Sequence, residues 1–124
     1  MIACRCVVSL ATMDDQPLRA VTVHRFPAER QPCDELAEEL AAFFRERQAD
    51  LHGLRETMVL VGWGAERVAV IAGWESREAQ IAGVARLRAD PDLLAIAKMS
   101  GGLAEHDEYR VASCGHRLET DGGC

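Results

Sequence analysis

His24 lies in the stretch VTVHRF, where apolar and polar residues alternate at the two-residue period of a β-strand. A histidine on a strand that faces an apolar pocket can take a proton from a phenol or an activated carbon atom near neutral pH. The same pattern also allows a buried, hydrogen-bonded histidine with no chemical role. His24 is therefore the first candidate for a catalytic residue, with a structural role as the alternative.

Five apolar side chains could form the walls of a pocket beside this histidine. Trp63 and Trp74 each end a strand-like run and could stack on a planar ligand, although a tryptophan in a half-buried strand is more often part of the core. Phe43 and Phe44 fall on the apolar side of a predicted helix, as core first and pocket wall second. Met58 could fill irregular space beside a ligand. We expect Phe43, Phe44, Met58 and Trp63 to be substrate-binding candidates and Trp74 to be a candidate catalytic residue beside His24.

The sequence gives little support for a metal or nucleotide site. Cysteines and a histidine near the two ends lack the Cys-x-x-Cys spacing of zinc sites; they are Cys4, Cys6, Cys114, His116 and Cys124. The stretch GWGAERV lies in a predicted hairpin and does not open a helix after a strand, as a nucleotide-binding glycine motif would. We therefore expect no metal and no cofactor. The odd number of five cysteines favours reduced thiols in the cytoplasm.

Charge and length exclude several classes of protein. Twenty acidic and fourteen basic residues give a net charge of −6, and the basic residues are scattered, so nucleic acid is not an expected partner. No segment approaches the ~18–20 consecutive apolar residues of a membrane-spanning helix. The 124 residues correspond to one domain. We expect a lead-in at 1–17, the domain at 18–112 and a flexible tail at 113–124.

The order of the predicted elements is typical of a ferredoxin-like α+β fold. Strands are expected at 18–26, 54–63, 67–74 and 108–113, and helices after Pro32, from Ser76 and from Asp90. Ser76 and Asp90 are of residue types that cap the first turn of a helix. The buried side of the helix from Ser76 is expected to comprise Ala79, Ile81, Ala82, Ala85 and Leu87.

The strands at 54–63 and 67–74 are apolar on both sides. In RVAVIAGW, Val68 and Val70 share one side while Ala69 and Ile71 share the other. An antiparallel sheet with one solvated face should alternate between apolar and polar residues, so both faces must be covered. Two helices can cover one face, and a second copy of the chain would cover the other. The pattern predicts a homodimer.

Residues 18–112 resemble the antibiotic biosynthesis monooxygenase family of dimeric α+β barrels. The similarity lies in the strand VTVHRF, in the HG that closes the next helix, in the junction GWESREA and in AEHDEY before the last strand. The resemblance implies a pocket between helices and sheet in each subunit, with Trp74 lining it and Ser76 capping the helix that forms its wall. It also makes His106 and Tyr109 candidate pocket residues.

The sequence departs from the family pattern at three positions. Cofactor-free oxygenases of the family typically carry an asparagine four residues before the tryptophan, where this chain has Val70. Haem-degrading relatives carry a histidine nine residues after the tryptophan, where this chain has Gly83. Haem cleavage is therefore not expected, and a pocket asparagine of some relatives is replaced by His24.

The resemblance implies a cofactor-independent tailoring enzyme that acts on a planar aromatic or polyketide-like molecule, most simply a monooxygenase. His24 would act as base or proton shuttle. A polyketide cyclase, isomerase or decarboxylase on the same fold is the second expectation, because each of these reactions also moves a proton beside an enolate. A non-catalytic dimer that binds a small molecule is the third.

Overall fold

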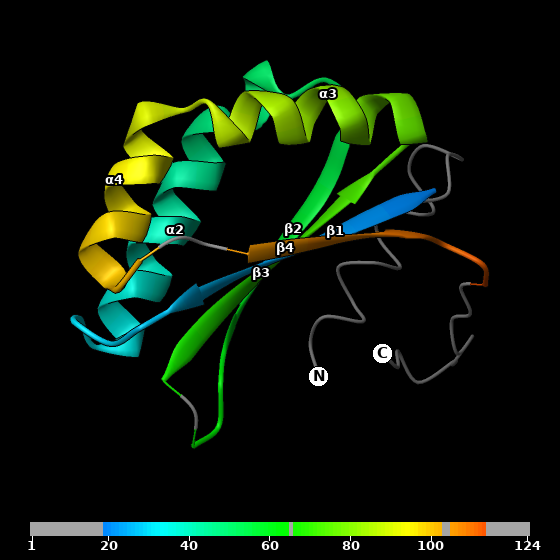
Figure 1. The fold of residues 1–124 in the computed structure, drawn as a ribbon. Helices are drawn as coiled ribbons and strands as arrows, with labels where there is room; N and C mark the ends of the chain where they lie inside the picture. The colour runs from blue at the N-terminus through cyan, green and yellow to red at the C-terminus, as the bar shows by residue number, and fades with distance from the viewer. Residues whose placement is uncertain (1–18, 65, 103–104, 114–124) are drawn as a thin grey trace, which may run out of the picture.

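The computed structural model describes residues 19–64, 66–102 and 105–113, which form one antiparallel sheet with helices on one face (Figure 1). The elements are β1 Ala20–Pro27, α2 Cys33–Arg47, the short 3-10 helix η1 Gln48–Asp50, β2 Leu54–Val61, β3 Arg67–Trp74, α3 Arg77–Arg88, α4 Pro91–Ser100 and β4 Glu105–Arg110. The strand order across the sheet is β2-β3-β1-β4. This is the ferredoxin-like α+β fold that the sequence predicts, with α4 as an additional helix before the last strand.

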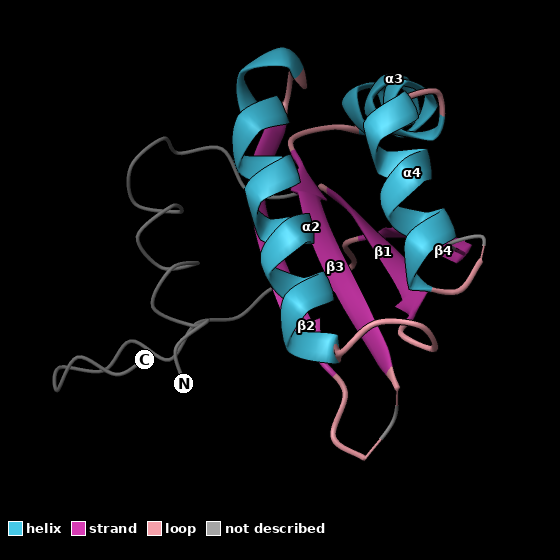
Figure 2. Ribbon diagram, turned by 90° about the vertical axis from the view of Figure 1, so that its left-hand side faces the viewer, coloured by secondary structure: helices cyan, strands magenta, loops and turns pink. Residues whose placement is uncertain are grey.

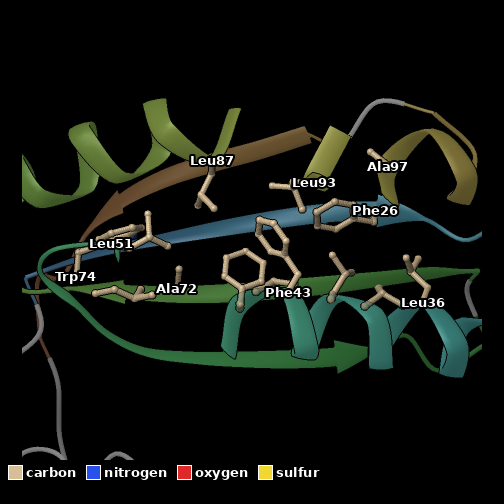
Figure 3. Close-up of a cluster of buried hydrophobic side chains, with 14 of the residues drawn as sticks. Phe26, Leu36, Phe43, Leu51, Ala72, Trp74, Leu87, Leu93 and Ala97 are labelled. Atoms are coloured by element: carbon tan, nitrogen blue, oxygen red, sulfur yellow. The ribbon is translucent and has the colours of Figure 1, made fainter. Parts of the chain in front are cut away.

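Different helices cover different strands of the sheet (Figure 2). Helix α2 packs over β2 and β3, whereas α3 and α4 lie over β1 on the side of β4. The core between these layers is a row of apolar side chains (Figure 3). Trp74 lies at one end of this row, and Phe26 and Ala97 lie at the other.

The apolar stripe of α2 is as predicted. Leu36, Leu40, Phe43 and Phe44 are buried, and they occur at the three- and four-residue spacing that places side chains on one side of a helix. Arg47, in the last turn of the helix, donates from Nε to the Asp90 carboxylate at 2.8 Å. This contact ties the end of α2 to the start of α4.

Both predicted helix caps are present. The Ser76 side chain accepts a hydrogen bond from the backbone N–H of Ala79 at 3.0 Å. The Asp90 carboxylate accepts from the N–H groups of Asp92 and Leu93, with Pro91 in the first turn. These caps satisfy backbone donors that have no partner within the helix, and so they define where α3 and α4 begin.

The predicted buried side of α3 was largely wrong. Ile81 is 53% exposed, and Ala82 and Ala85 are also exposed. The residues that face the sheet are Gln80, Gly83, Val84 and Leu87. Gly83 is on this side because the ring of Trp74 packs directly against it. The buried amide of Gln80 is satisfied by the Val21 carbonyl and the Thr22 hydroxyl.

The last strand begins three residues earlier than predicted, at Glu105. Its sequence EHDEYR is polar, so no apolar alternation marks it. The strand forms because its backbone pairs with β1, in a register that sets Ala20 opposite Arg110 and His24 opposite His106. An edge strand with charged side chains also resists pairing with other chains.

The face of the sheet opposite the helices is apolar near its centre. Strand pairing places six apolar residues on this face, which we call the open face: Val21, Val23, Met58, Leu60, Ala69 and Ile71. No helix among the described residues covers it (Figure 1). The lead-in at 1–17 and the tail from 114 onward lie outside the described residues.

Candidate functional site

A cavity of about 260 Å³ lies between β1 and β4 on one side and α3 and α4 on the other. It is lined by His24, Phe26, Leu87, Arg88, Leu93, Leu94, Ala97, Glu105 and His106. The apolar part of this wall comes from the end of α3 and one side of α4. Arg88, Leu94 and Glu105 are exposed, so they mark the side where the cavity meets solvent.

His24 is the buried polar group of this cavity. Its side chain is only 5% exposed, and its Nε2 has no hydrogen-bond partner among the described residues. Burial lowers the pKa of His24 to about 4, with a further lowering by the charge of His106 and an opposing effect of Glu108. The imidazole is therefore neutral at physiological pH. A buried nitrogen without a partner is available to a ligand that can hydrogen-bond to it.

His106 lies directly across from His24 on the neighbouring strand. The two ring centroids are 5.7 Å apart, and both rings line the cavity. The Nε2 atom of His106 is 3.0 Å from Oε2 of Glu108. Residues two apart on a strand point to the same face, which is why the carboxylate reaches the imidazole.

A chain of polar contacts continues from Glu108 into the core. Arg77 donates to Oε1 of Glu108 at 2.6 Å, and this contact lowers the pKa of the Glu108 carboxyl. The same Arg77 guanidinium donates to Gln80 at 2.7 Å. Gln80 donates to the Thr22 hydroxyl at 3.0 Å, and Trp74 Nε1 donates to the same oxygen at 3.0 Å. Helix α3 is thereby tied to both β1 and β4.

Of the predicted site residues, the structure places two in the wall of the cavity and two others next to His24. His24 and His106 line it, and the ring of Phe44 lies 6.2 Å from the ring of His24. Val70 is fully buried and paired with His24 across β1 and β3. Phe43 packs edge-on against Phe44 and belongs to the core behind that ring.

The other predicted site residues lie elsewhere. Trp74 is 0% exposed and lies at the far end of the core from Phe26 and Ala97 (Figure 3). Trp63 is 100% exposed in the turn after β2. The strand register places Met58 and Tyr109 on the face of the sheet opposite His24.

Several cavity residues were not singled out from the sequence. Leu93, Leu94 and Ala97 have the spacing of one helix side, but that spacing does not distinguish a cavity wall from core. Glu108 had a readable signal, because it stands two residues after His106 and must share its face in a strand. The misplaced start of the last strand hid that relation.

A metal site requires several ligand side chains close together. In the described part of the chain, no group of three or more histidine, cysteine, aspartate or glutamate residues is arranged to hold a metal ion. The terminal Cys4, Cys6, Cys114, His116 and Cys124 lie outside the described residues. At Gly83, even a Cβ atom would overlap the Trp74 ring, so a histidine ligand for haem iron has no room at this position.

No helix in the described ranges is long and apolar enough to span a membrane.

The sheet order and the single helical layer define a ferredoxin-like α+β protein. No protein-family model matches the chain, and no curated protein is similar to it in sequence. Solved structures, in contrast, share its fold over most of its length, and they include a monooxygenase from Streptomyces coelicolor and a protein from Deinococcus radiodurans described as a putative antibiotic biosynthesis monooxygenase.

Three of these structures illustrate the shared fold. A monooxygenase from the gene ActVA-Orf6 of Streptomyces coelicolor, in complex with nanaomycin D, has a TM-score of 0.64 at 18% identity and covers 83% of this chain and 94% of its own. SnoaB, a cofactor-independent oxygenase from Streptomyces nogalater, has a TM-score of 0.54 at 17% identity and covers 82% of this chain and 99% of its own. A dimeric ferredoxin-like protein from an uncultured marine organism has a TM-score of 0.62 at 14% identity and covers 86% of this chain and 98% of its own. These similarities confirm the fold that the family resemblance implied.

Proposed function

We propose that this protein is a cofactor-independent enzyme that acts on a planar aromatic or polyketide-like molecule, with oxygenation as its reaction. The observation that carries the proposal is an apolar cavity with one buried, neutral and unpartnered imidazole, that of His24. Apolar pockets with a few convergent polar groups are the usual sites of small-molecule chemistry. The shared fold with a cofactor-independent oxygenase adds support from analogy.

The volume of the cavity limits the size of the substrate that can bind in it. At about 260 Å³ it is slightly smaller than the ~300–1,000 Å³ of typical ligand pockets. One or two fused aromatic rings fit this volume, and any further ring extends toward solvent past Arg88 and Glu105. Trp74 has no contact with a ligand in this proposal, because it is bonded to Thr22 at the other end of the core.

The oxygenation requires only proton and electron transfers within the cavity. Loss of a proton from an activated CH₂ group of the substrate leaves a carbanion, which gives one electron to dioxygen. The resulting radical pair recombines to a peroxide, which takes up a proton and loses water to leave a carbonyl. His24 either accepts the substrate proton or hydrogen-bonds to the substrate oxygen, and the apolar wall excludes water.

A second candidate function is cyclisation, isomerisation or decarboxylation in the same cavity. It is favoured by Val70, a buried apolar residue next to His24 at the position where the resemblance places an asparagine. Without that amide, no side chain from β3 polarises a substrate oxygen. Binding without catalysis is the third candidate, and product analysis distinguishes it from both enzymes.

We also propose that the protein acts as a homodimer in the cytoplasm. The apolar open face supports the dimer, because contiguous apolar patches on a surface usually mark an interaction site. A structure of the same fold is described as dimeric. The odd cysteine count supports a reducing compartment.

The test is oxygen uptake by metal-stripped protein with an anthrone-type substrate, followed by product analysis. His24→Gln should reduce turnover by about 10²-fold or more, since loss of one positioned proton-transferring or hydrogen-bonding group costs that much. His52→Gln removes an exposed histidine outside the cavity and is the matched control. Turnover without oxygen uptake would instead support the second candidate, and binding without any product would leave a binding protein.

A further inference from the structure

Two histidines share the cavity but differ in their surroundings. His24 and His106 face each other across β1 and β4, and a single bound ring could contact both imidazoles. His24 is packed among apolar side chains, with the ring of Phe44 beside it. His106 lies nearer to solvent and has a carboxylate partner. The two side chains are therefore suited to different tasks.

His24 is a poor proton acceptor in this environment. Its burial opposes a positive charge, and the pKa of His24 is lowered to about 4 for that reason first. Among the described residues, Nε2 of His24 has no hydrogen-bond partner, and the Glu108 carboxylate contacts His106 instead. A neutral imidazole can still hydrogen-bond to a substrate oxygen and hold it.

His106 has the partner that a proton acceptor needs. Glu108 is held by Arg77, which lowers the pKa of the Glu108 carboxyl, so this group is ionised and can only accept hydrogen bonds. The Nε2 atom of His106 must then carry the hydrogen in the 3.0 Å contact, which leaves Nδ1 of the neutral ring as the acceptor. The carboxylate also stabilises the imidazolium that forms when Nδ1 takes a proton.

The charges around His106 come from three elements. Glu108 and Glu105 lie on its own strand, and His24 faces it from β1. Arg77 and Arg88 belong to α3, with Arg77 already paired to Glu108. Helix α4 contributes only the uncharged Leu93, Leu94 and Ala97 to the cavity. Glu108 is thus the charged group in direct contact with the His106 ring.

We propose that His106, oriented by Glu108, is the proton-accepting base of the cavity, and that His24 is the neutral group that hydrogen-bonds to the substrate oxygen. This division of roles rests on the proposed function of the same cavity. In the step itself, an O–H or C–H bond of the substrate breaks and an N–H bond forms at Nδ1 of His106. The electron pair stays on the substrate as an enolate or phenolate. Glu108 is a positioning residue, because it acts through His106.

The ring tautomers of the ligand-free protein test the geometry first. Nitrogen-15 NMR of the histidine side chains should show neutral His106 with its hydrogen on Nε2. In Glu108→Gln the amide can donate as well as accept, so this preference should be lost or reversed. Asp107→Asn is the matched control, because it removes a carboxylate from the same strand on the opposite face. Hydrogen on Nδ1 in the wild type, or no change in Glu108→Gln, would overturn the inference.

The second test uses 4-nitrophenol, a one-ring phenol whose ionised form absorbs visible light. The bound phenol should ionise at lower pH than the free phenol in wild type and in Asp107→Asn. In Glu108→Gln and His106→Gln the ionisation midpoint should rise by about one pH unit, a tenfold loss of proton acceptance. His24→Gln should weaken binding while the midpoint of the remaining complex stays low.

The outcomes distinguish a failure of the proposed function of the cavity from a failure of the role assigned to His106. If 4-nitrophenol does not bind the wild type, the proposed function of the cavity fails, whatever the tautomers are. If it binds but only His24→Gln abolishes its ionisation, His24 is the base and the inference is wrong. Ionisation that is lost with His106 or Glu108, and kept with His24 replaced, supports the inference.

Discussion

His24 combines a titratable ring with an environment that disfavours its charged form. Strand alternation makes its face predictable from the sequence, because Val21 and Val23 occupy the other face of β1. The burial of its side chain could not be predicted in this way, since it depends on Phe44 from α2 and on the cover supplied by α3 and α4. The chemistry of the residue is thus set by segments that are distant in the sequence.

The buried histidine makes stability dependent on pH. The folded-state pKa of about 4 is below the ordinary value of 6.5, so the unfolded chain binds a proton more readily than the folded one between these values. The contribution of His24 to the free energy of unfolding is therefore fully present above pH 6.5, and it is lost as the pH drops toward 4. Linkage gives a loss of about 2 kcal/mol between pH 7 and pH 5 from this group.

Urea unfolding of the wild type and His24→Gln at pH 7 and pH 5 measures this effect. The variant should lose most of the difference, because glutamine does not titrate. His52→Gln, which alters an exposed histidine, should keep the full pH dependence. An equal loss of stability in the wild type and in His24→Gln would show that His24 is not the group responsible.

At the scale of the element, α3 shows which features a sequence reveals. Its start was predictable because a serine cap is a local signal. Its buried face was not predictable from an apolar pattern, because Gly83 and Gln80 lie on that face whereas the apolar Ile81 is exposed. Gly83 is required by the Trp74 ring, and Gln80 is satisfied by the backbone of β1. Both reasons involve residues from other elements.

Gly83→Ala should destabilise the protein by about 2 kcal/mol, because the new methyl group overlaps the Trp74 ring. The ring cannot easily move, since its Nε1 is bonded to Thr22. In a Trp74→Phe background the overlap is relieved, and the same change should become neutral or stabilising through helix propensity. Thermal unfolding of the four proteins forms a double-mutant cycle. The same cost in both backgrounds would contradict the proposed contact.

At the scale of the whole molecule, helices cover one face of the sheet, and no helix among the described residues covers the apolar open face. The two-sided apolar strands made the covered face predictable, and the second cover that they also predict is the proposed dimer partner. The position of the cavity was not predictable, because it depends on how α4 folds back over β1 and β4. The sequence signal for α4 was its cap and its proline, which define where a helix starts but not what it covers.

The dimer proposal predicts that a charge at the centre of the open face separates the subunits. Ile71 pairs with Val23 on one side and Met58 on the other, so Ile71→Lys places an ammonium group in the middle of this face. Light scattering after size-exclusion chromatography should give a dimer for the wild type and a monomer for the variant. Ile81→Lys makes the same change at an exposed site on α3 and should remain dimeric. A monomeric wild type would refute the proposal.

The central claim is that the cavity between β1, β4, α3 and α4 is the site of the chemistry. Filling it with Ala97→Phe and measuring the binding of 2-naphthol, a planar two-ring phenol, tests this most directly. Ala95→Phe makes the same change at an exposed position of α4 and is the control. With both variants folded, as thermal unfolding would verify, we expect Ala97→Phe to weaken binding about tenfold or more, a loss of about 1.4 kcal/mol. Binding by Ala97→Phe that equals that of Ala95→Phe would contradict the account, because the ligand would then occupy some other part of the protein.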